Sequence, residues 1–242
     1  MKNNIILQHW NGTLPEWAKV AKKTVEKYCD HIGCQYQLVT GHPLGEKLGP
    51  NPQKLVYITE EYDQYEKVLM LDMDMIATNN YRNAFERPEI GVLHDRAMKG
   101  KSRTPPSAPD LFTLGMPIFF GNYIMTTKEQ RISMREHADW DWLATKLVDS
   151  YCGDEMLLAW LLKEADLLKG MSIKEMCMRC DGNSYEDIYF RKETRWDRKF
   201  TNLAFGGDET CYADKDATFL HFGQSRKHSI PEYANKIFGL LL

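Results

Sequence analysis

The segment KVLMLDMD at residues 67–74 constrains the fold of this chain more than any other. Its first five residues form a nearly continuous apolar run, which is typical of a strand buried on both faces in a parallel sheet. The run ends in two carboxylates, Asp72 and Asp74, one residue apart. Because an unpaired buried charge is costly, either the strand ends in water there or a positive charge lies beside this aspartate pair.

Strand and helix patterns alternate along the N-terminal part of the chain. Apolar runs predict further strands at residues 4–9, 35–40 and 90–93, and helical spacing predicts helices over 14–29 and 53–62. This order predicts an α/β fold with parallel strands, in which ligands bind beyond the carboxyl ends of the strands. The aspartate pair falls at that edge.

The C-terminal part has a looser pattern. It predicts strands at residues 117–125 and 217–222. It predicts helices at residues 128–138, 154–169 and 231–242. A basic, proline-rich stretch at residues 99–109 has nothing to bury and is either a lid over an acceptor site or an exposed connection. No repeat and no linker divides the sequence, so we expect a single domain over residues 1–242.

Composition excludes several classes of protein. A formal charge of −3 argues against broad, sequence-independent binding of nucleic acid, which needs a basic surface. No apolar run approaches the ~20 residues that cross a bilayer, and the apolar stretch near the start is too short for a signal peptide. The six cysteines are scattered, which predicts reduced thiols. We therefore expect a cytoplasmic protein without a membrane span.

The aspartate pair itself supports two kinds of chemistry. On an extended strand Asp72 and Asp74 share one face while Met73 points away, so two hard oxygen ligands would suit Mg²⁺ or Mn²⁺. The plain alternative is a solvated pair that ends a strand. A phosphatase with an aspartyl nucleophile also carries Asp-x-Asp after an apolar strand. Here Ile76 stands at the Thr/Val position of that signature, and two predicted strands come first.

Four segments, taken in order, resemble glycosyltransferase family 8 and its GT-A relatives over roughly residues 1–230. YEKVLMLDMD resembles the metal-binding strand of that family, and Lys54 stands where the family has a basic residue on the preceding helix. Asp154-Glu155 resembles the start of a family helix, and FLHFGQSRKHSI resembles the C-terminal motif. Gly223 comes one residue early in that motif, and the family's Pro-Trp is missing, which implies a distant relative.

The resemblance implies a fold, a reaction and a cofactor. It implies a single GT-A-like (Rossmann-like) α/β domain with a mixed, mainly parallel central sheet. Residues 1–94 would form the nucleotide-binding half, and residues 95–242 would form the acceptor-side half with the C-terminal metal and diphosphate motif. It implies transfer of a sugar, with retention, from a nucleotide diphosphate sugar, UDP-linked by the family's preference, to a glycan or another hydroxyl acceptor. The implied cofactor is Mn²⁺, with Mg²⁺ as the alternative.

The same resemblance assigns residues to roles. Asp72, Asp74 and His221 would hold the metal ion. The residues expected to bind the nucleotide-sugar donor are Lys54, Asp72, Gly223, Lys227 and Trp10. Lys227 would also assist departure of the diphosphate, and Asp154 and Glu155 are the remaining catalytic or sugar-binding candidates.

Each assignment has a structural alternative. A histidine that ends a strand is commonly a hydrogen-bonded structural residue, and Lys54 and Lys227 would serve equally as surface lysines. Asp154 and Glu155 also suit a helix N-cap and first turn. A non-catalytic module that binds a nucleotide sugar or a glycan would share the fold, although such a module has no need to stabilise a leaving group.

Overall fold

The protein is seen here as a computed structural model that describes residues 3–79, 81–86, 91–93, 119–146, 153–167, 218–222 and 224–239. Its central sheet has the strand order β2-β1-β3-β6-β5. The strands are β1 (Asn4–Trp10), β2 (Gln35–Thr40), β3 (Lys67–Leu71), β5 (Gly91–Leu93) and β6 (Phe119–Thr127).

The strand directions confirm the mixed, mainly parallel α/β sheet that the sequence predicted. β1 pairs in parallel with both β2 and β3, and β6 runs antiparallel to β3. β5 is antiparallel to β6 and therefore runs in the direction of the first three strands. β3 lies in the middle of the sheet, and its residues from Val68 to Leu71 are buried, as the apolar run indicated.

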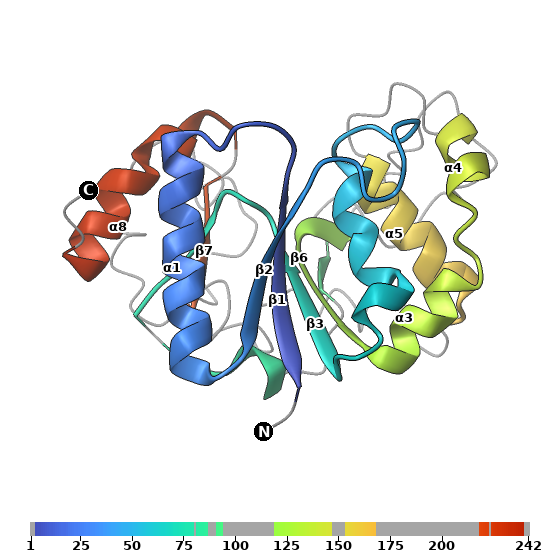
Figure 1. Cartoon of the computed structure of the whole chain (residues 1–242), viewed down its shortest axis with the longest axis horizontal. Helices are drawn as coiled ribbons and strands as arrows, with labels where there is room; N and C mark the ends of the chain where they lie inside the picture. Colours follow the sequence, from blue (N-terminus) through green and yellow to red (C-terminus); the bar gives the residue numbers. More distant parts are fainter. Residues whose placement is uncertain are drawn as a thin grey trace.

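Helices cover both faces of this sheet (Figure 1). α1 (Glu16–Ile32) and α8 (Ile230–Phe238) lie on one side. The other side carries α3 (Lys128–Arg135), α4 (Trp140–Lys146) and α5 (Gly153–Glu164), together with the 3₁₀ helices η1 (Pro52–Ile58) and η2 (Glu60–Tyr62). Two further 3₁₀ turns are η3 (Ala84–Glu86) and η7 (Gln224–Ser229).

Local sequence accounts for the ends of these helices. α1 begins after Pro15 and ends at Gly33, whose left-handed φ of 71° lets its N–H donate to the carbonyl of Cys29. The predicted helix over residues 53–62 is instead two 3₁₀ helices, because Thr59 between them has extended backbone (φ −73°, ψ 162°). α4 was not predicted from the sequence.

A second, two-stranded sheet corrects one detail of the sequence analysis. β4 (Met75–Ala77) pairs antiparallel with β7 (Phe219–His221), which sets Met75 opposite His221. β3 ends at Leu71, and residues 72–74 form a turn in which the N–H of Met75 donates to the carbonyl of Asp72 at 3.1 Å. The alternation of strand faces that was expected to align the two aspartates is therefore wrong.

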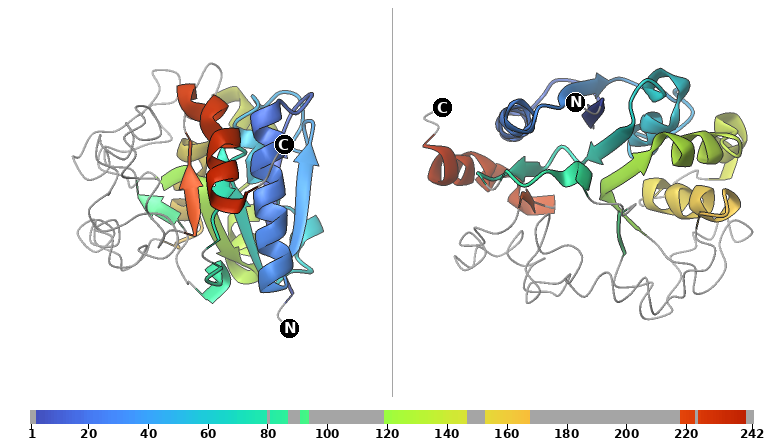
Figure 2. Two further views of the ribbon diagram at one scale, coloured as in Figure 1. Left: turned by 90° about the vertical axis from the view of Figure 1, so that its left-hand side faces the viewer. Right: turned by 90° about the horizontal axis from the view of Figure 1, so that it is seen from below.

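A separate apolar cluster fixes the small sheet to the helices on its side. Ile76 of β4, Leu220 of β7 and Phe222 pack with Val20 of α1 and Tyr233 of α8. Figure 2 shows α1 and α8 side by side on this flank. This cluster holds the C-terminal segment against the turn that carries the aspartate pair.

None of the helices in the described ranges combines the length and the apolar character that a bilayer span requires.

Candidate functional site

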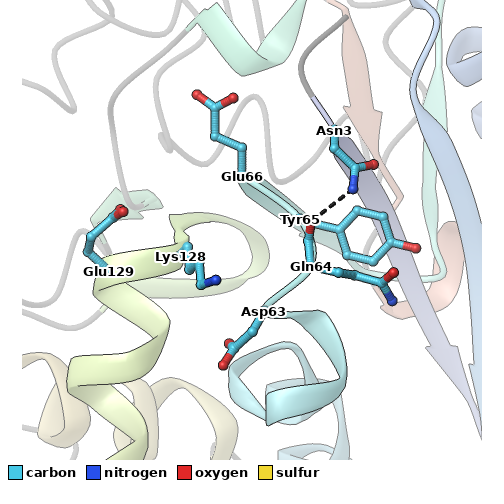
Figure 3. Close-up of a pocket in the computed structure, with 7 residues that line it drawn as sticks. All are labelled: Asn3, Asp63, Gln64, Tyr65, Glu66, Lys128 and Glu129. Atoms are coloured by element: carbon cyan, nitrogen blue, oxygen red, sulfur yellow. Dashed lines mark hydrogen bonds between the residues drawn. The ribbon is translucent and has the colours of Figure 1, made fainter.

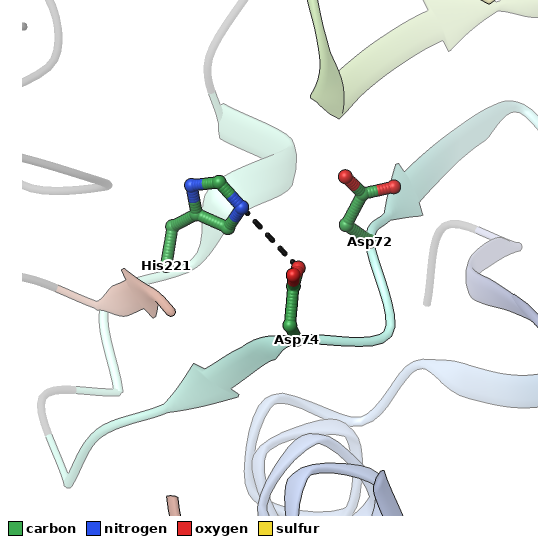
Figure 4. A group of neighbouring side chains, drawn as sticks. All are labelled: Asp72, Asp74 and His221. Atoms are coloured by element: carbon green, nitrogen blue, oxygen red, sulfur yellow. Dashed lines mark ion pairs between the residues drawn. The ribbon is translucent and has the colours of Figure 1, made fainter. Parts of the chain in front are cut away.

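Asp72, Asp74 and His221 meet beyond the carboxyl end of β3. Asp72 and Asp74 lie in the turn between β3 and β4. His221 is the last residue of β7, the strand that pairs with β4. One ligand atom from each side chain lies within 4.8 Å of the other two. Figure 4 shows both carboxylates and the imidazole directed toward a common space. The structure therefore assembles the predicted trio, though through a turn rather than through strand alternation.

Asp74 is the most buried member of the trio, with 6% of its surface exposed. Its Oδ1 lies 3.2 Å from Nε2 of His221, and its Oδ2 lies 3.0 Å from Nζ of Lys227. Burial alone would raise the pKa of Asp74, but His221 and Lys227 outweigh it and lower that pKa to about 2. Asp74 Oδ1 is buried and makes no well-aligned hydrogen bond; its polar neighbour is Nε2 of His221.

Lys54 of η1 joins Asp72 to the start of α5. Its Nζ lies 2.6 Å from Oδ1 of Asp72 and 2.7 Å from Oδ2 of Asp154, and it donates to the carbonyl of Gly121 at 3.2 Å. Burial would lower the pKa of Lys54, but the carboxylates of Asp154 and Asp72 more than compensate and hold that pKa above its usual range. Burial raises the pKa of Asp72 despite Lys54, and nearby Asp74 and Asp154 act in the same direction.

A pocket of about 310 Å³ opens beside these side chains. Such a volume lies within the range of small-molecule sites, about 300–1,000 Å³. Its wall includes the end of β1, the loop before η1, the β3–β4 turn and one lysine of η7. The lining residues are His9, Trp10, Asn11, Pro50, Asn51, Lys54, Met70, Leu71, Asp72, Met73, Asp74 and Lys227. Trp10 is therefore part of the pocket wall, and its contact with a nucleotide stays a prediction.

Two tryptophan rings lie beside Lys227 and the pocket wall. The Trp10 and Trp17 rings meet edge to face, with centroids 5.4 Å apart. Nζ of Lys227 lies 5.1 Å from the centroid of the Trp17 ring, within range of a cation–π interaction. Lys227 is thus held between an aromatic face and the carboxylate of Asp74.

A larger hollow of about 620 Å³ lies at the opposite edge of the sheet (Figure 3). Residues before β1 and β3 and at the start of α3 line it: Asn3, Asp63, Gln64, Tyr65, Glu66, Lys128 and Glu129. It lies at the amino ends of the parallel strands, away from the converging carboxylates. Volume alone would favour this hollow, but the possible metal ligands Asp72 and Asp74 line the smaller pocket.

The remaining predicted residues differ in what the structure says of them. Asp154 is buried in the first turn of α5 and contacts Lys54, whereas the half-buried Glu155 follows it and is not among the residues lining the pocket. Gly223 and the stretch 99–109 lie outside the described residues. Gly121 was missed as a site residue, because nothing in the local sequence FFGNYIM marks it as one.

Comparisons with known proteins bear on the fold. The sequence matches no protein-family model and no curated protein. In structure, the chain is similar to the bifunctional glycosyltransferase WbbM, with a TM-score of 0.50 and 12% identity, over 98% of this chain and 50% of that one.

Two further solved structures are similar to this chain at lower TM-scores. A glycosyltransferase involved in glycosylation of the major capsid of PBCV-1 has a TM-score of 0.45 and 12% identity, over 96% of this chain and 98% of that one. The galactosyltransferase LgtC, in complex with donor and acceptor sugar analogues, has a TM-score of 0.42 and 10% identity, over 98% and 97%.

The likeness to WbbM confirms the GT-A-like glycosyltransferase fold that the sequence resemblance predicted. The chain spans half the length of WbbM. Fold similarity at this identity does not carry an activity by itself, so the reaction has to be argued from the site.

Proposed function

We propose that this chain is a metal-dependent glycosyltransferase that uses a UDP-sugar as donor and a glycan or another hydroxyl group as acceptor. One observation carries the proposal: Asp72, Asp74 and His221 converge at the carboxyl edge of the sheet, with one ligand atom of each within 4.8 Å of the other two. Two carboxylates and an imidazole nitrogen brought this close together form a donor set that suits a divalent transition-metal ion.

The donor set fits a divalent cation. Two carboxylates and one imidazole suit Mn²⁺ better than Mg²⁺, because Mg²⁺ prefers oxygen ligands and retains most of its water. When bound, the cation would neutralise charge on the diphosphate of the donor as the glycosidic bond breaks. Asp72, Asp74 and His221 are the residues that would hold it.

Lys227 is proposed to stabilise the leaving diphosphate. Its ammonium group lies in the pocket wall, 3.0 Å from Asp74 and over the ring of Trp17, so it is already placed beside the metal ligands. A lysine acts on phosphate as a point charge and needs no bidentate geometry. The backbone N–H of Gly223, four residues earlier, is proposed to approach the same phosphates, and Trp10 to form the wall beside the nucleotide.

The start of α5 is proposed to face the sugar and its acceptor, with Asp154 and Glu155 as the acids nearest to it. The Asp154 carboxylate is buried and is paired with Lys54 at 2.7 Å. A carboxylate held in this way is a poor general base for an acceptor hydroxyl, because removing a proton would require it to give up a buried ion pair. This pairing argues against Asp154 as the base of an inverting reaction; retention, which the family resemblance implied, is part of the proposal.

The division of labour between the halves of the chain belongs to the same proposal. Residues 1–94 would supply the nucleotide side through β1, η1 and the aspartate turn. Residues 95–242 would supply the acceptor side and, through His221 and Lys227, the last metal ligand and the diphosphate lysine. The two halves would act as one domain.

Thermal unfolding with and without ligands tests this function. A ligand that binds only the folded state adds about 2.7 kcal/mol at 100 times its dissociation constant. We expect UDP to raise the Tm when Mn²⁺ is present and to do so far less in EDTA. Asp74→Asn should abolish the shift. Asp30→Asn, which changes an exposed aspartate of α1, is the matched control and should keep it.

Release of UDP from a panel of UDP-sugars then separates an enzyme from a binding module. Water can act as the acceptor, so slow release of UDP and free sugar in the presence of Mn²⁺ supports transfer chemistry. A Mn²⁺-dependent shift without turnover of any sugar favours the non-catalytic module. If neither UDP nor GDP raises the Tm, with or without Mn²⁺, the nucleotide-sugar proposal is refuted.

A further inference from the structure

Lys54 has no proton left over for a ligand. An ammonium group has three N–H donors, and its three neighbours here are Oδ1 of Asp72, Oδ2 of Asp154 and the carbonyl of Gly121, at 2.6, 2.7 and 3.2 Å. Only 14% of the Lys54 side chain is exposed. A lysine so enclosed is better suited to holding protein groups in place than to binding a donor phosphate.

Gly121 of β6 makes this arrangement possible because it lacks a side chain. A Cβ built on Gly121 would collide with Oδ2 of Asp154 and would lie 3.1 Å from both Cγ of Asp154 and Nζ of Lys54. Any larger residue would therefore push the Asp154 carboxylate away from Lys54. No left-handed backbone angle is recorded for Gly121, so the demand for glycine comes from close approach rather than from backbone conformation.

We propose that Lys54, Gly121 and Asp154 form a positioning unit that orients Asp72 for metal binding, an inference that rests on the proposed function. Lys54 donates to Oδ1 of Asp72 and so restrains the orientation in which that carboxylate would meet a cation. Asp154 holds Lys54 through a second ion pair, and Gly121 gives Asp154 the space to do so.

This arrangement links the two halves of the chain. η1 and the aspartate turn come from the first 94 residues, whereas β6 and the start of α5 come from the later part. Partners that orient metal ligands typically change metal affinity by about 10–100-fold when they are altered. The unit therefore predicts a metal affinity that depends on Gly121, a residue with no polar side chain of its own.

The first test needs neither metal nor nucleotide. Gly121→Ala should lower the Tm by about 2–12 °C, the range expected for an added methyl group in a packed site of a chain this long. Asp154→Ala removes the group that the new methyl would strike. In that background Gly121→Ala should cost less than half as much. Gly49→Ala is the matched control, because nothing lies within 4 Å of the added Cβ, and it should leave the Tm unchanged.

The second test measures Mn²⁺ affinity by electron paramagnetic resonance of free Mn²⁺ during titration, with UDP present. We expect Gly121→Ala to weaken Mn²⁺ binding about 10–100-fold and Gly49→Ala to leave it unchanged. A purely structural role for Gly121 would lower the Tm without moving this affinity.

The possible outcomes separate the inference from the proposed function. If the wild type binds Mn²⁺ and Gly121→Ala binds it equally well, the positioning role is overturned and the proposed function stands. If the effects of Gly121→Ala and Asp154→Ala on the Tm are additive, the contact between these residues is refuted, with or without metal. If the wild type binds no Mn²⁺, the proposed function fails and the orientation of a metal ligand fails with it.

Discussion

One buried amide side chain holds the loop that forms a wall of the pocket. Gln53 in η1 is 0% exposed, and its Oε1 accepts from the N–H of Leu44 at 2.9 Å. Its Nε2 donates to the carbonyls of Gly45 and Leu48 at 2.8 and 3.0 Å. The same loop continues to Pro50 and Asn51, which line the pocket. Gln53→Met would keep the length of the side chain and remove all three hydrogen bonds.

The expected loss of stability follows from those three bonds. A neutral hydrogen bond contributes about 0.5–1.5 kcal/mol net, and a buried partner left unsatisfied costs at least as much. Three such bonds give a loss of about 3 kcal/mol in the free energy of unfolding. For a domain of this size that corresponds to a fall of about 6–12 °C in Tm. The apolar side chain of methionine offsets little of this loss, because Gln53 is already fully buried and the substitution buries no additional surface.

Urea unfolding and hydrogen exchange together test this reasoning. The Leu44 amide should exchange much faster in Gln53→Met than in the wild type, because its acceptor is gone. Gln64→Met is the matched control: Gln64 is exposed and donates only to the carbonyl of Glu61 at 3.2 Å, so its loss should cost less than about 0.5 kcal/mol. A cost below about 1 kcal/mol for Gln53→Met, with Leu44 still protected, would refute the claim that one side chain holds this loop.

Three further predictions concern charged groups. Lys227→Met should lower the rate of sugar transfer by about 100-fold or more, measured as kcat for UDP release, because it removes one stabilising charge from the leaving group; an unchanged kcat would exclude that role. Removing Mn²⁺ with EDTA should abolish turnover, and adding Mn²⁺ back should restore it, whereas full activity in EDTA would contradict the metal-dependent mechanism.

The third prediction in this group concerns acid stability. Two hydrogen bonds from Arg135 hold the pKa of Asp63 below its ordinary value of 3.8. A carboxyl with a lowered folded-state pKa contributes stability above its ordinary value and loses it as the pH falls. Urea unfolding of Asp63→Asn should therefore show a deficit of stability at pH 7 that shrinks below about pH 4. A deficit that stays constant down to pH 3 would contradict this assignment.

The sequence predicted the central features of the fold and the identity of the converging residues. The apolar run before Asp72 gave the position of β3, because only a strand in the middle of a sheet buries such a run on both faces. The C-terminal motif singled out His221 and Lys227, which the structure brings to Asp74 from more than a hundred residues away. Their roles as metal ligand and diphosphate lysine remain predictions.

What the sequence could not give depended on contacts between distant short segments. β4 and β7 are three residues each, and neither carries a pattern strong enough to predict their pairing. The turn at residues 72–74 goes with that pairing. The expectation that Asp72 and Asp74 share one face assumed a continuous strand and therefore could not predict the turn. The collision that excludes a side chain at Gly121 depends on α5 approaching β6, which no local pattern in FFGNYIM encodes.

The balance of charge at the site explains why these groups belong together. Three carboxylates (Asp72, Asp74 and Asp154) contact two ammonium groups, Lys54 and Lys227. An imidazole binds a metal in its neutral form, so an arriving cation would meet one more negative charge than positive. A divalent cation overcompensates this excess and leaves a net positive site, which a diphosphate can then enter. Lys227 would exchange its contact with Asp74 for one with phosphate, so cation and nucleotide should each strengthen binding of the other.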